Sequence, residues 1–134
     1  MKKIKLLLLF CLVAIAASAS KTVYLKPSAN WLTDSPRFAL YMFTGTDPGV
    51  WTDFAAVIGA EGIYSAEFDN TYASMIICRM DPDDTENKWD NKWNQSSDLI
   101  GPAVSGLLYT FAEGWDNPTV TVSIYGAKQI FLIE

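Results

Sequence analysis

The stretch Tyr72-Ala73-Ser74-Met75-Ile76-Ile77-Cys78-Arg79-Met80 is the most apolar of the segments in which strand-forming residues gather. Its centre, Met75-Ile76-Ile77-Cys78, is apolar without interruption, whereas a strand with one solvated face alternates apolar and polar residues. The stretch therefore predicts a central strand that is covered on both faces and anchors the core.

Shorter runs of the same kind precede and follow this stretch. They are rich in Val, Ile, Tyr, Phe and Thr, which fit pleated surfaces better than helices, and turn signals separate them. No segment shows sustained helical periodicity, so we expect an all-β fold, an antiparallel, immunoglobulin-like β-sandwich. The expected strands cover residues 21–26, 37–43, 50–57, 63–68, 72–80, 107–111, 119–125 and 129–133.

The N-terminus has the composition of a secretory signal peptide. Three lysines precede twelve apolar residues, 6–17, and the small residues Ala17-Ser18-Ala19 offer a cleavage site. Twelve apolar residues are too few for a membrane-spanning helix, which needs roughly 20. A lipoprotein would have to use Cys11, which bulky Phe10 precedes. We therefore expect a signal peptide at residues 1–19 and one secreted β-sandwich domain at residues 20–134.

Charge and cysteine content narrow the possible partners. Without the signal peptide, 7 basic residues would face 15 acidic ones, a net charge near −8. Such a surface repels phosphate backbones and anionic membranes, so neither nucleic acid nor a membrane is an expected partner. Cys78 would be the one remaining cysteine, which excludes an intramolecular disulfide. Its apolar neighbours indicate a buried, inert thiol rather than a nucleophile.

The absence of histidine bears on catalysis. It excludes Ser-His-Asp and Cys-His sites and removes the commonest general base and metal ligand. A glycosidase with paired carboxylates remains conceivable, but it needs two acids that converge across a cleft, and most acids here lie in expected turns. We therefore expect neither enzymatic activity nor a cofactor.

A polar segment, residues 81–96, follows the central strand and is longer than most loops of compact domains. Its acidic part, residues 81–87, could supply oxygen ligands to calcium, although it lacks the alternating ligands and mid-loop glycine of a helix-loop-helix calcium site. A solvated loop explains the same residues. Two tryptophans within the segment argue against disorder.

Aromatic residues are the informative feature of the chain. Four of its five tryptophans fall in expected loops or at strand ends, where a core between strands does not need them. Indole faces match the apolar C–H faces of a pyranose ring, and amides and carboxylates bond its hydroxyls. Indoles and hydrogen-bonding side chains are densest together at residues 89–96, where Trp89 and Trp93 flank Asp90, Asn91 and Lys92 and precede Asn94 and Gln95. The alternative is that these indoles pin the loop to the core. The four tryptophans are Trp31, Trp89, Trp93 and Trp115.

A second aromatic group lies on the expected strands 37–43 and 50–57. Alternation places Phe38, Leu40 and Met42 on one face of the first strand and Tyr41 on the other. If the first set forms the core, Tyr41 and Trp51 form a solvent-facing platform that favours ligand binding.

These residues resemble a known family. Val23-Tyr24-Leu25-Lys26-Pro27, Trp31, Arg37-Phe38-Ala39-Leu40-Tyr41 and Trp51, with residues 76–82 and 89–95, are similar to the starch-binding modules of family 26 of carbohydrate-binding modules. The resemblance extends over about residues 21–115.

The resemblance implies a β-sandwich that holds α-glucan on two or three aromatic side chains, usually as an appendage of an amylase. By position, the aromatic pair would be Tyr41 and Trp51. The family often carries another aromatic two residues before the first, where this chain has Ala39. No catalytic domain is attached, so the chain would be a free-standing binder or the partner of a separate secreted amylase.

We therefore expect a secreted, non-catalytic protein that binds starch-like α-glucan, as polysaccharide or oligosaccharide. The alternative is a secreted structural or adhesive β-sandwich protein that binds another protein, because protein-binding hot spots also favour Trp and Tyr. The expected carbohydrate-binding residues are Tyr41, Trp51, Trp31, Trp89, Trp93, Asn94 and Gln95.

Overall fold

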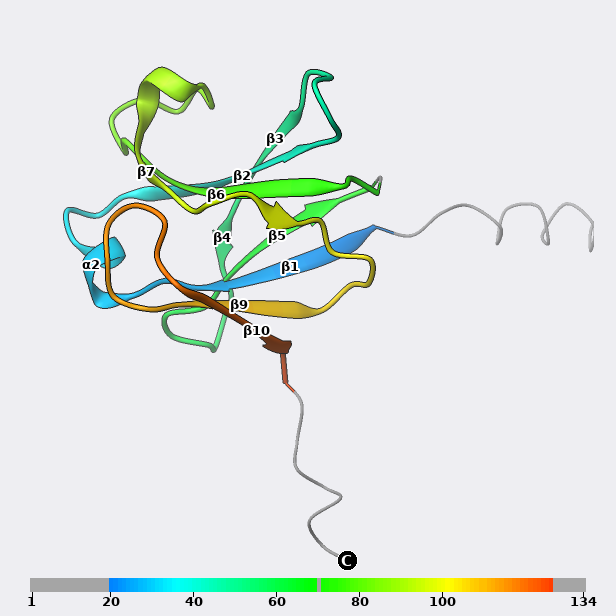
Figure 1. Cartoon of the computed structure of the whole chain (residues 1–134). Helices are drawn as coiled ribbons and strands as arrows, with labels where there is room; N and C mark the ends of the chain where they lie inside the picture. The colour runs from blue at the N-terminus through cyan, green and yellow to red at the C-terminus, as the bar shows by residue number, and fades with distance from the viewer. Residues whose placement is uncertain (1–19, 70, 127–134) are drawn as a thin grey trace, which may run out of the picture.

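The computed structural model describes residues 20–69 and 71–126, which form two β-sheets lying one above the other (Figure 1). The expected signal peptide at residues 1–19 and the last expected strand, residues 129–133, lie outside the described residues. No helix in the described part of the chain is long and apolar enough to cross a bilayer.

Ten short strands, one helical turn and one 3₁₀ turn make up the described fold. In chain order they are β1 (Lys21–Lys26), α2 (Ala29–Leu32), β2 (Arg37–Phe43), β3 (Val50–Asp53), β4 (Ala55–Ala56), β5 (Tyr64–Phe68), β6 (Ser74–Met80), η1 (Trp89–Asn91), β7 (Lys92–Gln95), β8 (Leu99–Ile100), β9 (Leu107–Phe111) and β10 (Val120–Ile124).

The first sheet has the order β10-β9-β1-β5-β4, and the second has the order β3-β2-β6-β7, with β8 also pairing with β6. Strands β1 and β9 run parallel, and the other pairs are antiparallel. The main apolar core draws side chains from both sheets, among them Val23 and Leu25 of β1 and Leu40 of β2. The expected all-β class is confirmed.

Strand β6 is central in the second sheet and buried on both faces, as the sequence predicts. Met75 and Ile77 are 0% exposed and belong to the core between the sheets. Ile76, Cys78 and Met80 point the other way and form a smaller buried cluster with Ala39 on the outer face. That outer face therefore needs a cover of its own.

The prediction of one continuous strand over residues 50–57 is wrong. Strand β3 pairs with β2 in the second sheet, whereas β4 pairs with β5 in the first. Between them, Phe54 is 9% exposed, belongs to the core and donates its N–H to the carbonyl of Phe38 at 3.0 Å. Burial of this ring accompanies the crossing of the chain from one sheet to the other.

The expected polar loop over residues 81–96 is also shorter than predicted. Irregular chain covers residues 81–88, and η1 and β7 follow, with β7 pairing with β6 as an edge strand. Edge strands tolerate charged side chains because one of their sides faces solvent. For that reason the polar composition of β7 looked like that of a loop.

Trp31 lies in a helical turn instead of an exposed loop, which corrects its expected role as a sugar-binding ring. Ser28 caps the turn, accepting the N–H of Trp31 at 3.4 Å, and the Glu113 carboxylate accepts the N–H groups of Ala29 and Asn30. The indole is 0% exposed and packs on Phe111 at 4.7 Å between ring centroids.

We predict that Trp31→Ala lowers the free energy of unfolding by about 3–5 kcal/mol, because a fully buried indole leaves a cavity. Denaturant titration measures the change. The neighbouring Leu32→Ala is the control: Leu32 is 41% exposed, so its loss should cost less than about 1 kcal/mol. Equal effects of the two substitutions would contradict the burial of Trp31.

Candidate functional site

Three aromatic rings meet on the outer face of the second sheet. Tyr41 of β2, Trp51 of β3 and Trp89 of η1 have ring centroids 4.8–4.9 Å apart in every pair. The ring planes are inclined to one another by 55° to 66°. Trp89 is 41% exposed, and Tyr41 and Trp51 are partly buried. We call these three residues the aromatic cluster.

Strand register places two members of the aromatic cluster together. Tyr41 and Trp51 are directly paired between β2 and β3, so their side chains stand on the same face. The hydroxyl of Tyr41 accepts the N–H of Gly49 at 2.9 Å. A Cβ at Gly49 would lie 2.4 Å from Cζ of Tyr41, so only glycine allows this close approach.

Arg37 holds the segment that brings the third ring. Its guanidinium donates to the carbonyl oxygens of Asp81 and Asp84 and to Oδ1 of Asn87, at 2.7–3.3 Å. An ion pair with Asp53 at 3.5 Å completes its contacts. The segment over residues 81–88 is thereby fastened to β2 and β3, and Figure 1 shows it rising above the second sheet. Trp89 follows directly and reaches the two strand aromatics.

Polar groups surround the aromatic cluster. Asn87 donates to the carboxylate of Asp53 at 2.7 Å, and Nζ of Lys92 lies 5.9 Å from the ring centroid of Trp89. Lys92 also donates to the side-chain oxygen of Gln95. Partly exposed rings can stack on an apolar surface of a ligand, and the amide, carboxylate and ammonium groups beside them can hydrogen-bond hydroxyls at its rim.

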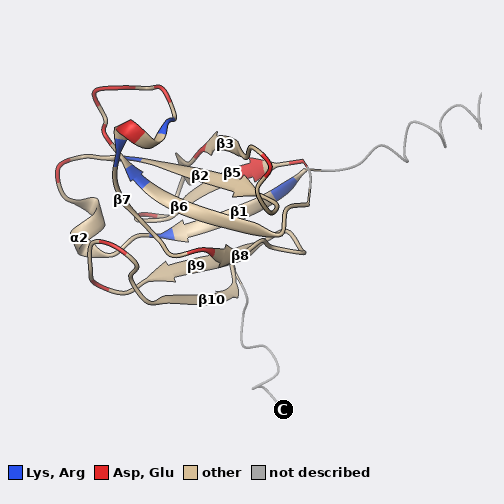
Figure 2. Ribbon diagram, turned by 45° about the horizontal axis from the view of Figure 1, so that its top comes forward, with Lys and Arg blue, Asp and Glu red and all other residues tan. Residues whose placement is uncertain are grey.

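The acidic segment is ordered by its own turns. The Asp84 carboxylate accepts the N–H of Glu86 at 3.0 Å, and this hydrogen bond is the first cause of a lowered Asp84 pKa. Figure 2 shows acidic residues along this loop and at other turns. Within residues 20–69 and 71–126, no three His, Cys, Asp or Glu side chains form a group that could hold a metal ion.

Cys78 lies beneath the outer-face cover and is 0% exposed. Burial raises the pKa of its thiol to about 12. At neutral pH the thiol is therefore protonated, and it serves as a small apolar side chain.

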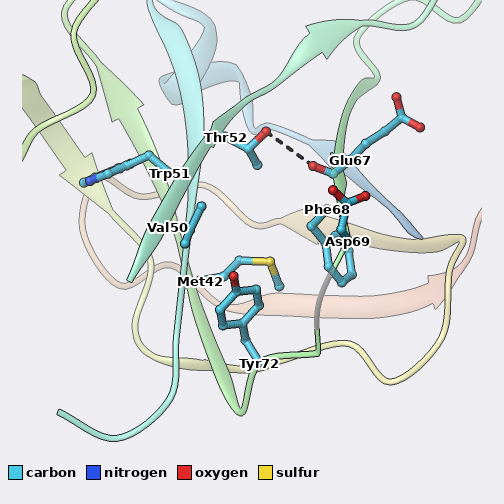
Figure 3. A pocket seen from close by; sticks show the side chains of 8 residues that line it. All are labelled: Met42, Val50, Trp51, Thr52, Glu67, Phe68, Asp69 and Tyr72. Carbon is cyan, nitrogen blue, oxygen red and sulfur yellow. Dashed lines mark hydrogen bonds between the residues drawn. The ribbon is translucent and has the colours of Figure 1, made fainter. Parts of the chain in front are cut away.

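A side pocket of about 330 Å³, which the sequence did not suggest, opens next to β3. It lies where β3 passes β5, and Oγ1 of Thr52 donates to the carbonyl of Glu67 at 3.3 Å across this edge (Figure 3). The indole of Trp51 points away from the pocket. The walls of the pocket come from strands of both sheets, a juxtaposition that alternation of residue types along one segment does not reveal. Its lining residues are Met42, Val50, Trp51, Thr52, Glu67, Phe68, Asp69 and Tyr72.

The structure unites two of the sequence-predicted groups and separates the rest. Tyr41 and Trp51 from the strand platform join Trp89 from the polar segment. Trp93 lies over the guanidinium of Arg79 instead, and the Asn94 side chain accepts a hydrogen bond from that guanidinium at 3.1 Å.

Other site residues differ from the prediction in their bonding or were missed. Both polar atoms of the Gln95 side chain have partners within the protein, Lys92 and the carbonyl of Ser96. Arg37 and Asn87 were missed as site residues. The signal that could have found them is an arginine at the start of an expected strand, which needs acceptors that the acidic segment over residues 81–87 can supply.

Comparison of the chain with models of known protein families, with curated proteins and with solved structures found no match. The resemblance to starch-binding modules therefore stays a prediction from the residues.

We predict that Cys78 reacts with a thiol reagent at pH 8 only after unfolding. The difference in titrated thiol between wild type and Cys78→Ser measures this residue alone. Because the pKa is higher in the folded than in the unfolded chain, the associated stability is fully present below about pH 9 and is lost as pH rises toward 12. Rapid reaction of Cys78 in the native protein would contradict its burial.

We predict that Arg37→Ala loosens the segment over residues 81–91 without unfolding the domain. Hydrogen exchange at the N–H groups of Asp81 and Asn91, both bonded within this segment, should accelerate about tenfold or more, since hydrogen bonds to a charged group are lost. Lys88→Ala is the control in the same segment, because the Lys88 ammonium pairs with Glu86 at an exposed site, where an ion pair contributes little. Unchanged exchange in Arg37→Ala would show that the anchor is not needed.

Proposed function

We propose that this chain is a secreted, non-catalytic carbohydrate-binding protein with an immunoglobulin-like β-sandwich fold. In this proposal the aromatic cluster of Tyr41, Trp51 and Trp89 binds starch-like α-glucan. The observation that carries the proposal is the meeting of rings from three separate segments, one of them 41% exposed, within a rim of hydrogen-bonding side chains.

The inclination of the rings supports a curved ligand. Planes inclined by 55° to 66° do not form the flat platform that an extended, ribbon-like glucan would need. An α-linked glucan curves, so successive sugar rings can meet differently inclined aromatic faces. The choice of α-glucan follows from this shape and from the resemblance of the sequence.

Charge supports a neutral ligand. The chain carries a formal net charge of −5, and acidic residues lie on the loop that precedes β7 and on other turns (Figure 2). A polyanion would be repelled by this surface, whereas a neutral polysaccharide would not. A separate secreted amylase is the proposed partner, for which such a binder would hold the polymer.

The first test is migration in a native gel that contains amylopectin. We predict retardation of the wild type relative to a plain gel, and an apparent affinity that falls about tenfold or more in Trp51→Ala and in Trp89→Ala, as for loss of a central aromatic contact. Tyr125→Ala is the aromatic control. Tyr125 stacks on Tyr24 of the first sheet, with 4.0 Å between their ring centroids, and does not belong to the aromatic cluster. Unaltered mobility of the wild type would overturn the proposal.

A protein partner is the second candidate function. An apolar groove of about 480 Å³ lies between β8 and the β9–β10 pair, and Ile100 and Val122 on its walls are 86% and 51% exposed. In that case the protein would be a secreted structural or adhesive β-sandwich protein. Ile100→Asp would then abolish partner binding and leave sugar-induced changes in tryptophan fluorescence intact.

A further inference from the structure

A second pair of exposed tryptophans lies outside the aromatic cluster. The guanidinium carbon of Arg79 is 4.8 Å from the ring centroid of Trp93 and 5.2 Å from that of Trp115. Trp93 is 38% exposed and Trp115 is 46% exposed, whereas Arg79 is 4% exposed. We call these three residues the Arg79 cluster.

The arginine of this cluster is occupied by the protein. It donates to the carbonyl oxygens of Trp31 and Thr33 and to Oδ1 of Asn94, and it pairs with Asp34 at 3.8 Å. Protein acceptors thus surround the guanidinium, and an acidic side chain balances its charge. Arg79 therefore orients the two rings by cation–π contact rather than recognising an anion.

The segment that carries Trp115 is held at several points. The Trp115 carbonyl accepts Nε1–H of Trp31 at 2.8 Å, and N–H of Gly114 donates to the side chain of Asn30 at 2.9 Å. On the other side, Oδ1 of Asp116 accepts N–H of Gln95 at 3.1 Å. A backbone fixed in this way presents a half-exposed indole whose orientation is set before any ligand arrives, which lowers the entropic cost of binding.

Unusual backbone conformations adjoin the same cluster. Among the described residues other than glycine, positive φ angles occur at Asp34 (63°), Ser35 (49°) and Asn117 (51°). Asp34 contacts Arg79, Ser35 is the next residue, and Asn117 donates its N–H to the carbonyl of Gln95 at 2.9 Å. Such conformations cost free energy and gather at binding sites.

The surroundings suit a neutral, hydroxyl-rich ligand. Two exposed rings supply apolar stacking faces, and the carboxylate of Asp34, 79% exposed, offers acceptors for hydroxyl groups. The Asp116 carboxylate, also in an exposed residue, adds further acceptors and repels anions.

We propose that the Arg79 cluster is a second α-glucan site, so that one chain binds two segments of polysaccharide. This inference rests on the proposed function of the aromatic cluster. The two sites lie around the edge strand β7: Trp89 begins the 3₁₀ turn η1 that leads into this strand and reaches the outer face, whereas Trp93 belongs to the strand and stacks on Arg79. Two sites on one polymer raise the apparent affinity above that of either site alone.

The test follows the five indole N–H signals of the intact, nitrogen-15-labelled protein during titration with maltoheptaose. Single Trp→Phe variants assign the signals. We expect the signals of Trp93 and Trp115 to move together, and to move also in the double variant Trp51→Ala/Trp89→Ala. The signal of buried Trp31 reports that each variant is folded.

Amylopectin gels give the second readout. Trp93→Ala/Trp115→Ala should weaken retardation about tenfold or more, while maltoheptaose still shifts the signals of Trp51 and Trp89. If Trp93 and Trp115 stay still in the unsubstituted protein while Trp51 and Trp89 move, the second site is overturned and the proposed function stands. If no indole signal moves and the gel shows no retardation, both proposals fail.

Discussion

The two-sided burial of β6 is the constraint on which the rest of the structure depends. Its inward residues Met75 and Ile77 complete the core between the sheets, but Ile76, Cys78 and Met80 would face water if the outer side of the sheet were bare. Burying a side chain of the size of Ile or Met is worth about 1.5–3 kcal/mol, so a cover over Ile76 and Met80 matters to a small domain. Large aromatic side chains provide much of that cover, and because they lie at the surface they also leave faces open to a ligand.

At the end of β6, the burial of Arg79 likewise depends on side chains that cover it. A guanidinium directed into a protein interior must find acceptors for its N–H groups, and here they come from the α2 turn and from β7. The two flanking indoles shield what remains of the charge. The helical turn, the edge strand and the loop after β9 thus all contact one buried cation, in addition to the hydrogen bonds that join them directly.

The features that the sequence could predict are those that depend on alternation along one segment. Uninterrupted apolar character placed β6 in the centre, and the period of two on β2 separated Leu40 from Tyr41 correctly. Contacts between segments that are distant in the sequence could not be predicted in this way. Trp31 and Trp89 both stand in short helical turns between strands, and the groups that hold the first turn and its indole in place are a carboxylate and a carbonyl more than eighty residues away. The crossing at Phe54 and the strand β7 were missed because each depends on a partner strand.

The strand aromatics Tyr41 and Trp51 and the loop aromatic Trp89 form one cluster, and this changes the surface that a ligand would contact. A platform of Tyr41 and Trp51 alone would be a shallow surface open on every side, and a loop with Trp89 alone would be a mobile arm. Arg37 converts the pair into one site, because its contacts with the backbone of residues 81 and 84 set the position of the indole that follows. The absence of an aromatic at Ala39 fits this arrangement. That position is 0% exposed and lies in the outer-face cluster on which Tyr41 and Trp51 pack, so a larger side chain there would push those two rings out of place.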